Sequence, residues 1–406
     1  MFLTTNKYLV NMKLTIFDGD SNHCFGCGAC FQICPKDAIS MIPNDEGFLF
    51  PLIDNDACIE CNLCSKVCPV VGQNLAGIQN PLSANVYAAW NNDKAQLMES
   101  TSGGIFPLLA NVILSKGGVV YGCAWAENEI KAIQVRIDSN DELMKLKGSK
   151  YVQSSTEKTY IQVKEDLKEG KLVLYSGTPC IIAGLKLFLQ KEYQNLYLID
   201  LVCHGVPSPK MLTAYVNYSE KKEGYKLKNL QFRDKRESGW RTWVSWEKPN
   251  QKKAYKPIGL EPYMKGFFQG FFNRESCYCC SMASPHRLGD VTLADYWGIQ
   301  LSHPELTSKQ KYGISLVLSN NKKGDDLLNK ITSKATLVRS SFENAAKKNP
   351  CLLHPDPRPA IRNNIYVDLN NKNFDFLANT CLKPKLAFIR KLIPSWAKNI
   401  IKELRK

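Results

Sequence analysis

One spacing of cysteines occurs twice within residues 24–69 and restricts the fold of this region more than any other feature. Cysteines stand at positions 24, 27, 30 and 34, followed by proline, and again at 58, 61, 64 and 68, followed by proline. Both runs fit the bacterial C-x2-C-x2-C-x3-C-P pattern, in which three close cysteines bind one 4Fe-4S cluster and the fourth binds the other cluster. The spacing therefore predicts two clusters, one bound by Cys24, Cys27, Cys30 and Cys68 and the other by Cys58, Cys61, Cys64 and Cys34.

Zinc is the alternative occupant of these cysteines, because it also binds tetrahedral sets with C-x2-C spacing. Zinc does not require eight cysteines in two matching runs, each closed by a proline, so the spacing favours iron-sulfur clusters. Between the two runs, residues 38–42 and 48–53 flank an Asn-Asp-Glu-Gly turn and predict a hairpin that covers the clusters.

The length, charge and cysteine distribution set limits on the rest of the chain. A chain of 406 residues exceeds the roughly 250–300 residues that one hydrophobic core usually supports, so several domains are expected. Its 16 cysteines are clustered, and no secretory signal or continuous apolar run of about 18 residues stands out, which predicts a cytoplasmic protein that does not cross a membrane. The net charge of +15 favours an acidic partner, but no nucleic-acid-binding motif is present, so we expect no nucleic acid.

After a polar linker around residues 71–84, the pattern becomes mixed α/β. The clearest unit is a strand over 172–175, a helix over 181–190 and a second strand over 196–202, which predicts a parallel pair with a right-handed crossover. We expect Thr178 to cap this helix and Pro179 to occupy its first position. The fold class is thus a bacterial-type ferredoxin fold with two 4Fe-4S clusters, followed by a mixed α/β body with a parallel βαβ unit.

Six short motifs within residues 84–300 carry a resemblance to a known family. They are STSGGIF at 100–106, KGSKYV at 147–152, SGTPC at 176–180, CHG at 203–205, CYCC at 277–280 and GDVTLADYWG at 289–298. In this order they resemble the coenzyme F420 hydrogenase/dehydrogenase beta-subunit family, here with a ferredoxin module fused in front. On this basis we expect a ferredoxin-type domain over 1–75, the family's N-terminal α/β region over 84–165, its C-terminal α/β region over 166–340 and a basic tail over 341–406.

The resemblance implies an iron-sulfur flavoprotein oxidoreductase. Members of this family hold a flavin, usually FAD, near an iron-sulfur cluster and exchange electrons with a small substrate, a coenzyme or a redox partner protein. The family includes enzymes that do not use the deazaflavin coenzyme, so the fold does not identify the substrate. The alternative is a non-enzymatic electron-transfer subunit that relays electrons to a partner oxidoreductase.

Candidate flavin-binding residues lie in three of these motifs. Thr101, Ser102, Gly103 and Gly104 offer hydroxyls and open backbone at a helix start, and Gly177 and Thr178 precede the crossover helix, where an anion is favoured. Lys150 is suited to a flavin carbonyl or to the charge of a reduced flavin, and His204 to proton donation. The alternatives are an ordinary helix cap, a solvated lysine and a hydrogen-bonded loop histidine.

A third cluster is a further expectation. Cys277 and Cys280 match the family's C-x2-C motif and leave Cys279 as an extra thiol, but two cysteines cannot complete a 4Fe-4S site. By motif, the nearest additional ligands are Cys180 and Cys203. The alternative is that Cys277 and Cys280 are structural thiols. Cys123, Cys351 and Cys381 have no companions in the sequence and are expected to be ordinary residues.

The segment from residue 341 onwards is basic and rich in proline, and is expected to be loop-like. Near its end, residues 388–404 place Phe, Ile, Leu and Trp side chains on one stripe among lysines and arginines. Such a stripe suits a helix that lies on anionic lipid, which would place the protein at the inner surface of the membrane. Docking of this helix on the protein's own body is the alternative.

Overall fold

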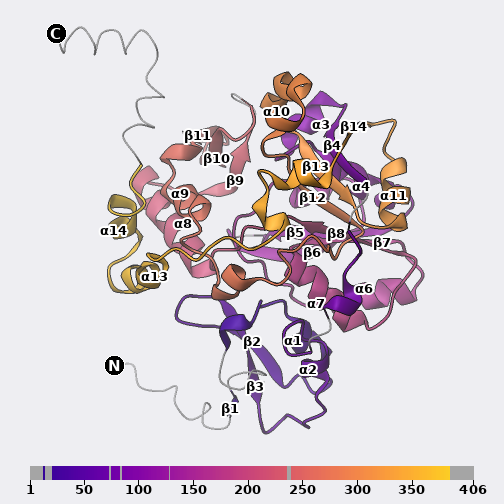
Figure 1. The fold of residues 1–406 in the computed structure, drawn as a ribbon. Helices are drawn as coiled ribbons and strands as arrows, with labels where there is room; N and C mark the ends of the chain where they lie inside the picture. The colour runs from indigo at the N-terminus through magenta and orange to yellow at the C-terminus, as the bar shows by residue number, and fades with distance from the viewer. Residues whose placement is uncertain are drawn as a thin grey trace, which may run out of the picture.

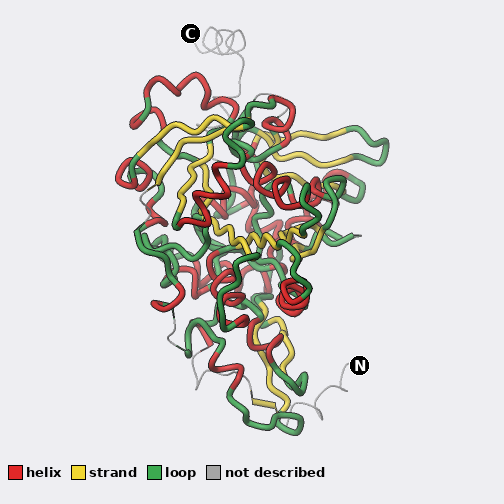
Figure 2. The backbone as a smooth tube through the Cα atoms, turned by 90° about the vertical axis from the view of Figure 1, so that its right-hand side faces the viewer, coloured by secondary structure: helices red, strands yellow, loops and turns green. Residues whose placement is uncertain are grey.

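The computed structural model describes residues 12–13, 21–72, 75–82, 85–127, 129–235 and 239–384. We call residues 21–72 the cluster module and residues 85–384 the body. The cluster module lies at one end of the body, next to helices α6 (Thr159–Lys168) and α7 (Pro179–Leu189) (Figure 1). Seen from the side, the module extends away from the body as a narrow projection (Figure 2). The fold is the mixed α/β architecture that the sequence predicts.

The cluster module is built around the predicted hairpin. Strands β2 (Ile39–Pro43) and β3 (Leu49–Asp54) pair antiparallel, and β1 (Met12–Lys13) pairs with the outer side of β3. The turn uses Gly47 at φ +84° and a bond from the Phe48 amide to Asn44 Oδ1 of 2.9 Å. One short helix lies in each cysteine run: α1 (Ala29–Ile33) and α2 (Leu63–Lys66).

The body is organised by an eight-stranded mixed sheet. In spatial order its strands are β14 (Ala335–Ser340), β4 (Asn85–Asn91), β13 (Ser315–Ser319), β12 (Val291–Asp295), β8 (Leu196–Leu201), β7 (Val173–Gly177), β5 (Val119–Trp125) and β6 (Ala132–Ile137). The four strands β12, β8, β7 and β5 are mutually parallel, and the outer pairs are antiparallel. The predicted βαβ unit is therefore confirmed as β7, α7 and β8.

Helices cover both faces of this sheet. Val119, Tyr121 and Tyr175 point to the face that α6 and α7 cover, whereas the alternating residues Val120 and Leu174 point to the opposite face. There they meet α4 (Ile105–Leu114) and α11 (Lys322–Asn329). Because every second residue of a strand faces the same side, these central strands must be apolar at nearly every position.

A second sheet lies beside the first. Its strands β9 (Lys228–Asp234), β10 (Trp243–Glu247) and β11 (Lys253–Pro257) form an antiparallel meander. Its core is shared with α8 (Pro209–Glu223), α9 (Pro262–Phe268), α13 (Arg362–Asn371) and α14 (Phe374–Asn379). The remaining helices are α3 (Lys94–Glu99), α5 (Leu143–Leu146), α10 (Ile299–Ser302) and α12 (Phe342–Ala346). Aromatic residues dominate this core, and Phe232 and Tyr263 stack with ring centroids 5.4 Å apart.

The expectation of a loop-like segment after residue 341 is wrong for its described part. Helices α12, α13 and α14 form there. Ile365 and Leu369 of α13 are four residues apart and share one face of that helix, and they pack with Leu377 of α14 into the core of the second sheet. The apolar stripe over residues 388–404 lies outside the described residues. Among the described helices, none has the length and apolar character that crossing a membrane requires.

Candidate functional site

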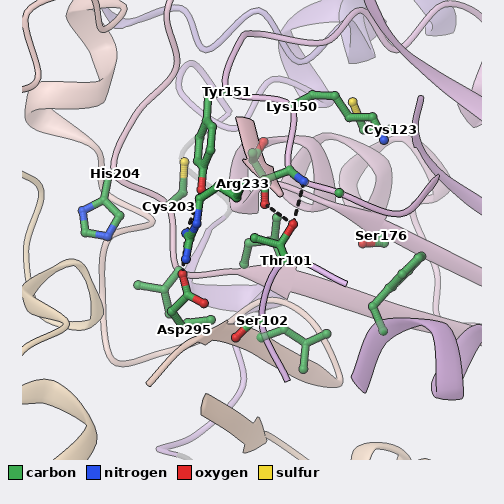
Figure 3. Close-up of a pocket in the computed structure, with 18 of the residues that line it drawn as sticks. Thr101, Ser102, Cys123, Lys150, Tyr151, Ser176, Cys203, His204, Arg233 and Asp295 are labelled. Carbon is green, nitrogen blue, oxygen red and sulfur yellow. Dashed lines mark hydrogen bonds and ion pairs between the residues drawn. The ribbon is translucent and has the colours of Figure 1, made fainter. Parts of the chain in front are cut away.

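A cavity of about 730 Å³ opens at the carboxyl ends of the parallel strands β7 and β8. Residues 176–178, which end and follow β7, line it together with residues 201–206, which end and follow β8. Ligands of open α/β sheets commonly bind outside the carboxyl ends of the strands, where the connecting loops separate. We call this space the main cavity (Figure 3).

The structure brings almost all of the predicted flavin-binding residues to the main cavity. Thr101, Ser102, Gly104, Gly177, Thr178 and Lys150 line it, and so does His204. Gly103 does not line the cavity. A Cβ at this position would lie 2.2 Å from the Ala89 carbonyl oxygen and 2.6 Å from the Ser315 amide nitrogen. Gly103 therefore allows the α4 loop to approach strands β4 and β13.

Two helices begin at the wall of the main cavity. Helix α4 follows Gly104, whose φ is +72°, and α7 follows Thr178. Neither residue caps its helix with a side chain, so the prediction that the Thr178 hydroxyl would cap α7 is wrong; it contacts Cys180 Sγ at 3.2 Å instead. Pro179 occupies the first turn of α7 as predicted. The N-H groups at the two helix starts favour an anionic group in the cavity.

Polar atoms without partners also line the main cavity. Gln134 Oε1, Asn349 Oδ1 and both Nε and Nη2 of Arg233 are buried and have no hydrogen-bond partner among the described residues. Buried polar atoms are normally paired, because leaving one unpaired costs about 1–3 kcal/mol. A polar ligand would supply these partners, and the volume lies within the roughly 300–1,000 Å³ of typical ligand pockets. The lining therefore fits a flavin.

Lys150 and His204 lie on opposite sides of the main cavity (Figure 3). Lys150 Nζ donates to the carbonyl oxygens of Lys145 and Lys147 at 2.9 and 3.0 Å, and burial lowers its pKa to about 8. His204 Nδ1 lies 3.1 Å from Asp356 Oδ2. The two residues therefore reach different parts of any bound ligand.

One part of the wall of the main cavity is a group of aromatic and cationic residues that the sequence did not reveal. Arg233 Nη1 donates to Asp295 Oδ2 at 2.7 Å and to the Tyr151 hydroxyl at 2.9 Å (Figure 3). Arg241 lies 4.0 Å from the ring centroid of Trp297 and has no carboxylate partner among the described residues. Two guanidinium groups thus share one carboxylate, which leaves this part of the wall positive.

A smaller cavity of about 60 Å³ is lined by Cys180, Cys203, Cys277 and Cys280. We call these residues the four-cysteine site. Cys180 comes from the first turn of α7, Cys203 follows β8, and Cys277 and Cys280 come from the turn at η4 (Glu275–Cys279) and just after it. Cys203, His204 and Thr178 line both this cavity and the main cavity, so the two spaces adjoin.

The thiols of the four-cysteine site are close enough to act on one another. Burial, with the neighbouring Cys180 next in effect, raises the pKa of Cys203 to about 12 and that of Cys280 to about 11. Burial likewise raises the pKa of Cys277, with Cys203 next in effect. Four half-buried thiols held together in this way are unfavourable as thiolates unless a positive centre binds them. The site fits a metal cluster, and the Gly205 amide donates to Cys203 Sγ at 3.4 Å.

Two further cysteines differ from expectation. Cys351, expected to be without companions, is buried, lines the cavity of the four-cysteine site and lies 3.4 Å from His204 Nδ1. Its ligand atom and those of His204 and Asp356 lie within 4.8 Å of one another. Cys123 lies beside Lys150, whose charge lowers the thiol pKa that burial raises. The sequence could not place Cys351, because about 150 residues separate it from His204.

The eight cysteines of the cluster module form two groups. Cys24, Cys27, Cys30 and Cys68 are all buried, and mutual repulsion adds to the burial that raises the pKa of Cys27 and Cys30. We call this group the proximal set. Cys58, Cys61, Cys64 and Cys34, the distal set, are half-buried or exposed. Each group contains the four cysteines of one predicted ligand set, and the ligand sets themselves stay predictions.

The body binds the loop of the proximal set through its carbonyl oxygens. Arg274 Nε and Ser276 Oγ donate to the Cys24 carbonyl at 2.6 and 2.9 Å. Gln153 Nε2 donates to the Phe25 carbonyl at 3.1 Å, and the Tyr160 hydroxyl donates to the Cys27 carbonyl at 3.0 Å. On α7, a Cβ at Gly184 would lie 3.0 Å from Cys27 Sγ. The proximal set therefore faces the first turns of α7, where Cys180 lies.

Comparison with known proteins gives two sequence matches. Residues 170–344 match the C-terminal part of the coenzyme F420 hydrogenase/dehydrogenase beta subunit, and residues 18–74 match a 4Fe-4S dicluster domain. No curated protein matches the chain. Among solved structures, a chain of the F420-reducing [NiFe] hydrogenase complex from Methanosarcina barkeri, studied by xenon derivatization, shares 14% identity and a TM-score of 0.45. That match covers 67% of this chain and 88% of the other.

The two sequence matches fall on the regions that carry the paired cysteine runs and the four-cysteine site. The chain thus contains a region similar to the C-terminal part of the coenzyme F420 hydrogenase/dehydrogenase beta subunit, preceded by a 4Fe-4S dicluster domain.

Proposed function

We propose that this protein is an iron-sulfur flavoprotein oxidoreductase that exchanges electrons with a small substrate or a redox partner protein. The proximal and distal sets each hold a 4Fe-4S cluster, the four-cysteine site holds a third, and the main cavity binds FAD. Its relationship to electron-transfer oxidoreductases rests on the family and on the dicluster domain. The flavin and the third cluster are our own assignments, supported by the geometry of the two cavities.

One observation carries this proposal. Cys203 lines both the cavity of the four-cysteine site and the main cavity, while Cys180 of the same site lies close enough to Cys27 of the proximal set to raise the pKa of its thiol, after the larger effect of burial. The three sites therefore follow one another from the module into the body. A continuous series of this kind suits electron transfer and is unnecessary for cysteines that only stabilise the fold.

The chain's own residues supply the binding and the proton chemistry. The starts of α4 and α7 bind the anionic part of the cofactor, and Lys150 and Gln134 bind its polar ring edge. His204, oriented by Asp356 at 3.1 Å, holds a proton at the wall that the two cavities share. A bound flavin would exchange single electrons with clusters and electron pairs with a substrate.

Anaerobic purification followed by analysis of iron, sulfide and flavin tests this function. We expect one flavin per chain, bleached by dithionite, together with iron and sulfide for three clusters. Iron and sulfide without flavin would instead indicate an electron-transfer subunit without its own active site. A Gln134→Leu variant should lose flavin and keep its iron, because Gln134 lines the main cavity, its Oε1 atom is buried without a partner, and the residue does not line the cavity of the four-cysteine site.

A further inference from the structure

Arg274 is a fully buried cation at the junction of the cluster module and the body. Its side chain is 1% exposed. Nε donates to the Cys24 carbonyl at 2.6 Å, and Nη1 donates to Gln153 Oε1 at 3.2 Å. The guanidinium carbon lies 4.0 Å from the ring centroid of Phe50. Among the described residues no carboxylate pairs with Arg274, and its Nη2 atom is buried without a partner.

Two other buried arginines show how unusual this is. Arg287 and Arg362 are also 1% exposed, but Arg287 lies 3.4 Å from Asp200 and Arg362 lies 2.6 Å from Glu46. A buried charge is costly to maintain unless an opposite charge is near it. Arg274 has only neutral acceptors and an aromatic ring, so its counter-charge must come from a group other than a carboxylate of the described chain.

The groups around Arg274 that can carry negative charge are cysteines of two sites. Its side chain binds the Cys24 carbonyl, and its own carbonyl accepts the Cys277 amide at 2.9 Å. Gln153, which accepts from Arg274 Nη1 at 3.2 Å, lines the cavity of the four-cysteine site, and so does Ser276, which shares the Cys24 carbonyl with Arg274. Gly26 makes this approach possible, because a Cβ there would lie 3.0 Å from Arg274 Nη1. Arg274 thus lies between the proximal set and the four-cysteine site.

We propose that Arg274 is a positioning residue whose fixed charge raises the midpoint potentials of the proximal cluster and of the cluster in the four-cysteine site. This inference rests on the clusters of the proposed function. Each one-electron reduction adds a negative charge, which a nearby buried cation stabilises because the interior screens charge poorly. Three of the distal cysteines come from a different loop and the distal set is more exposed, so the charge of Arg274 raises the potential of the distal cluster less. Electrons are then held at the body side of the module.

Redox titration with dithionite, followed by electron paramagnetic resonance, tests the inference on the full chain. In Arg274→Gln we expect the signals of the proximal cluster and of the four-cysteine site to shift to lower potential, while the distal signal stays in place. In Arg274→Lys both potentials should lie close to their wild-type values, because lysine keeps the positive charge. Unchanged potentials in Arg274→Gln with full iron content would overturn the proposal.

A second variant keeps the test valid if Arg274→Gln does not retain its clusters. Gln153→Glu places a carboxylate next to Nη1 and compensates the charge of Arg274 without removing the side chain, so the same two potentials should fall. Potentials that remain unchanged in Gln153→Glu would contradict the inference. Lys372→Gln is the control, because it removes a lysine that already pairs with Asp368 at 3.0 Å and does not line the cavity of the four-cysteine site. These signals are read from the clusters alone, so a missing flavin would refute the proposed function without affecting this result.

Discussion

Arg362 on α13 forms a two-point ion pair with Glu46 in the hairpin turn of the cluster module. Nη1 lies 2.8 Å from Glu46 Oε1 and Nη2 lies 2.6 Å from Oε2, while Nε donates to the Asn273 carbonyl at 2.9 Å. Through Arg362 of α13, Asn273, which precedes Arg274, is thereby joined to the cluster module. Residues 46, 273 and 362 hold the module in one position relative to the cavities.

Loss of this pair should loosen the module. Replacing Arg362 with Gln leaves Glu46 without its partner, and we expect a cost on the order of 2 kcal/mol, because Glu46 is only partly buried. Hydrogen exchange of the β2–β3 amides should become faster. Lys372→Gln is the matched control, since it removes an exposed pair with Asp368 just after the same helix. Equal exchange rates in Arg362→Gln and the wild type would refute this role.

The four-cysteine site can be tested by single substitutions. Cys280→Ser removes one of the four thiols, and the iron content should fall by about four atoms from a total of about twelve per chain. Cys279→Ser provides a close control, because Cys279 is exposed and its Sγ lies 3.8 Å from the Ser276 carbonyl, outside the lining of the small cavity. Iron analysis and electron paramagnetic resonance should separate the two variants. If both keep the wild-type iron content, the third cluster is absent.

The cluster of the distal set should be lost without loss of the other clusters. We expect Cys64→Ser to lower the iron content and to remove the paramagnetic signal of one cluster, because a serine hydroxyl binds iron poorly in place of a thiolate. The proximal signal should persist, since the body binds the loop that carries Cys24 and Cys27. Cys381→Ser, near the end of the described chain, should leave every signal unchanged. A Cys64→Ser protein with all of its signals would contradict the predicted ligand sets.

Lys235 predicts a pH dependence of stability. Its Nζ donates to the carbonyl oxygens of Ser102 and Tyr312 at 2.7 Å, and burial lowers its pKa to about 7 from 10.5. Between these values the unfolded chain binds more protons than the folded one, so this group makes the free energy of unfolding rise with pH, by up to about 1.4 kcal/mol per pH unit.

The measurement is the difference in melting temperature between the wild type and Lys235→Met at pH 7 and at pH 9. From pH 7 to pH 9 the melting temperature of the wild type should rise relative to that of Lys235→Met, because the variant lacks the titrating amine. Lys248→Met, which removes an exposed lysine near the end of β10, should show the same difference at both pH values. If the melting temperature of the wild type relative to Lys235→Met instead rises from pH 9 to pH 7, the prediction is wrong.

The sequence predicts most reliably the features that depend on neighbouring residues. The cysteine spacing predicts the module, and the turn at Gly47 predicts its hairpin, because both are determined within a few residues. The βαβ unit follows from a strand, a helix and a strand in succession. The role of Gly103 could not be predicted, since it depends on a close approach to Ala89 of β4 and Ser315 of β13.

Features that depend on distant contacts were harder to foresee. Cys180 and Cys203 could be named from their motifs, but their meeting with Cys277 and Cys280 depends on how the chain folds back over the sheet. The unpaired charge of Arg274 could not be recognised, because in the sequence an arginine next to Glu275 suggests an ordinary exposed pair. In the structure Glu275 binds Arg358 instead, at 2.7 Å.

Flavin content is the measurement that tests the central claim most directly. Protein purified without oxygen should contain one flavin per chain, with an absorption band that dithionite bleaches and an oxidant restores. It should also contain iron and sulfide for three clusters. Protein that carries its iron and sulfide but no flavin, even after incubation with FAD, would contradict the claim that the main cavity is the active site of a flavoprotein.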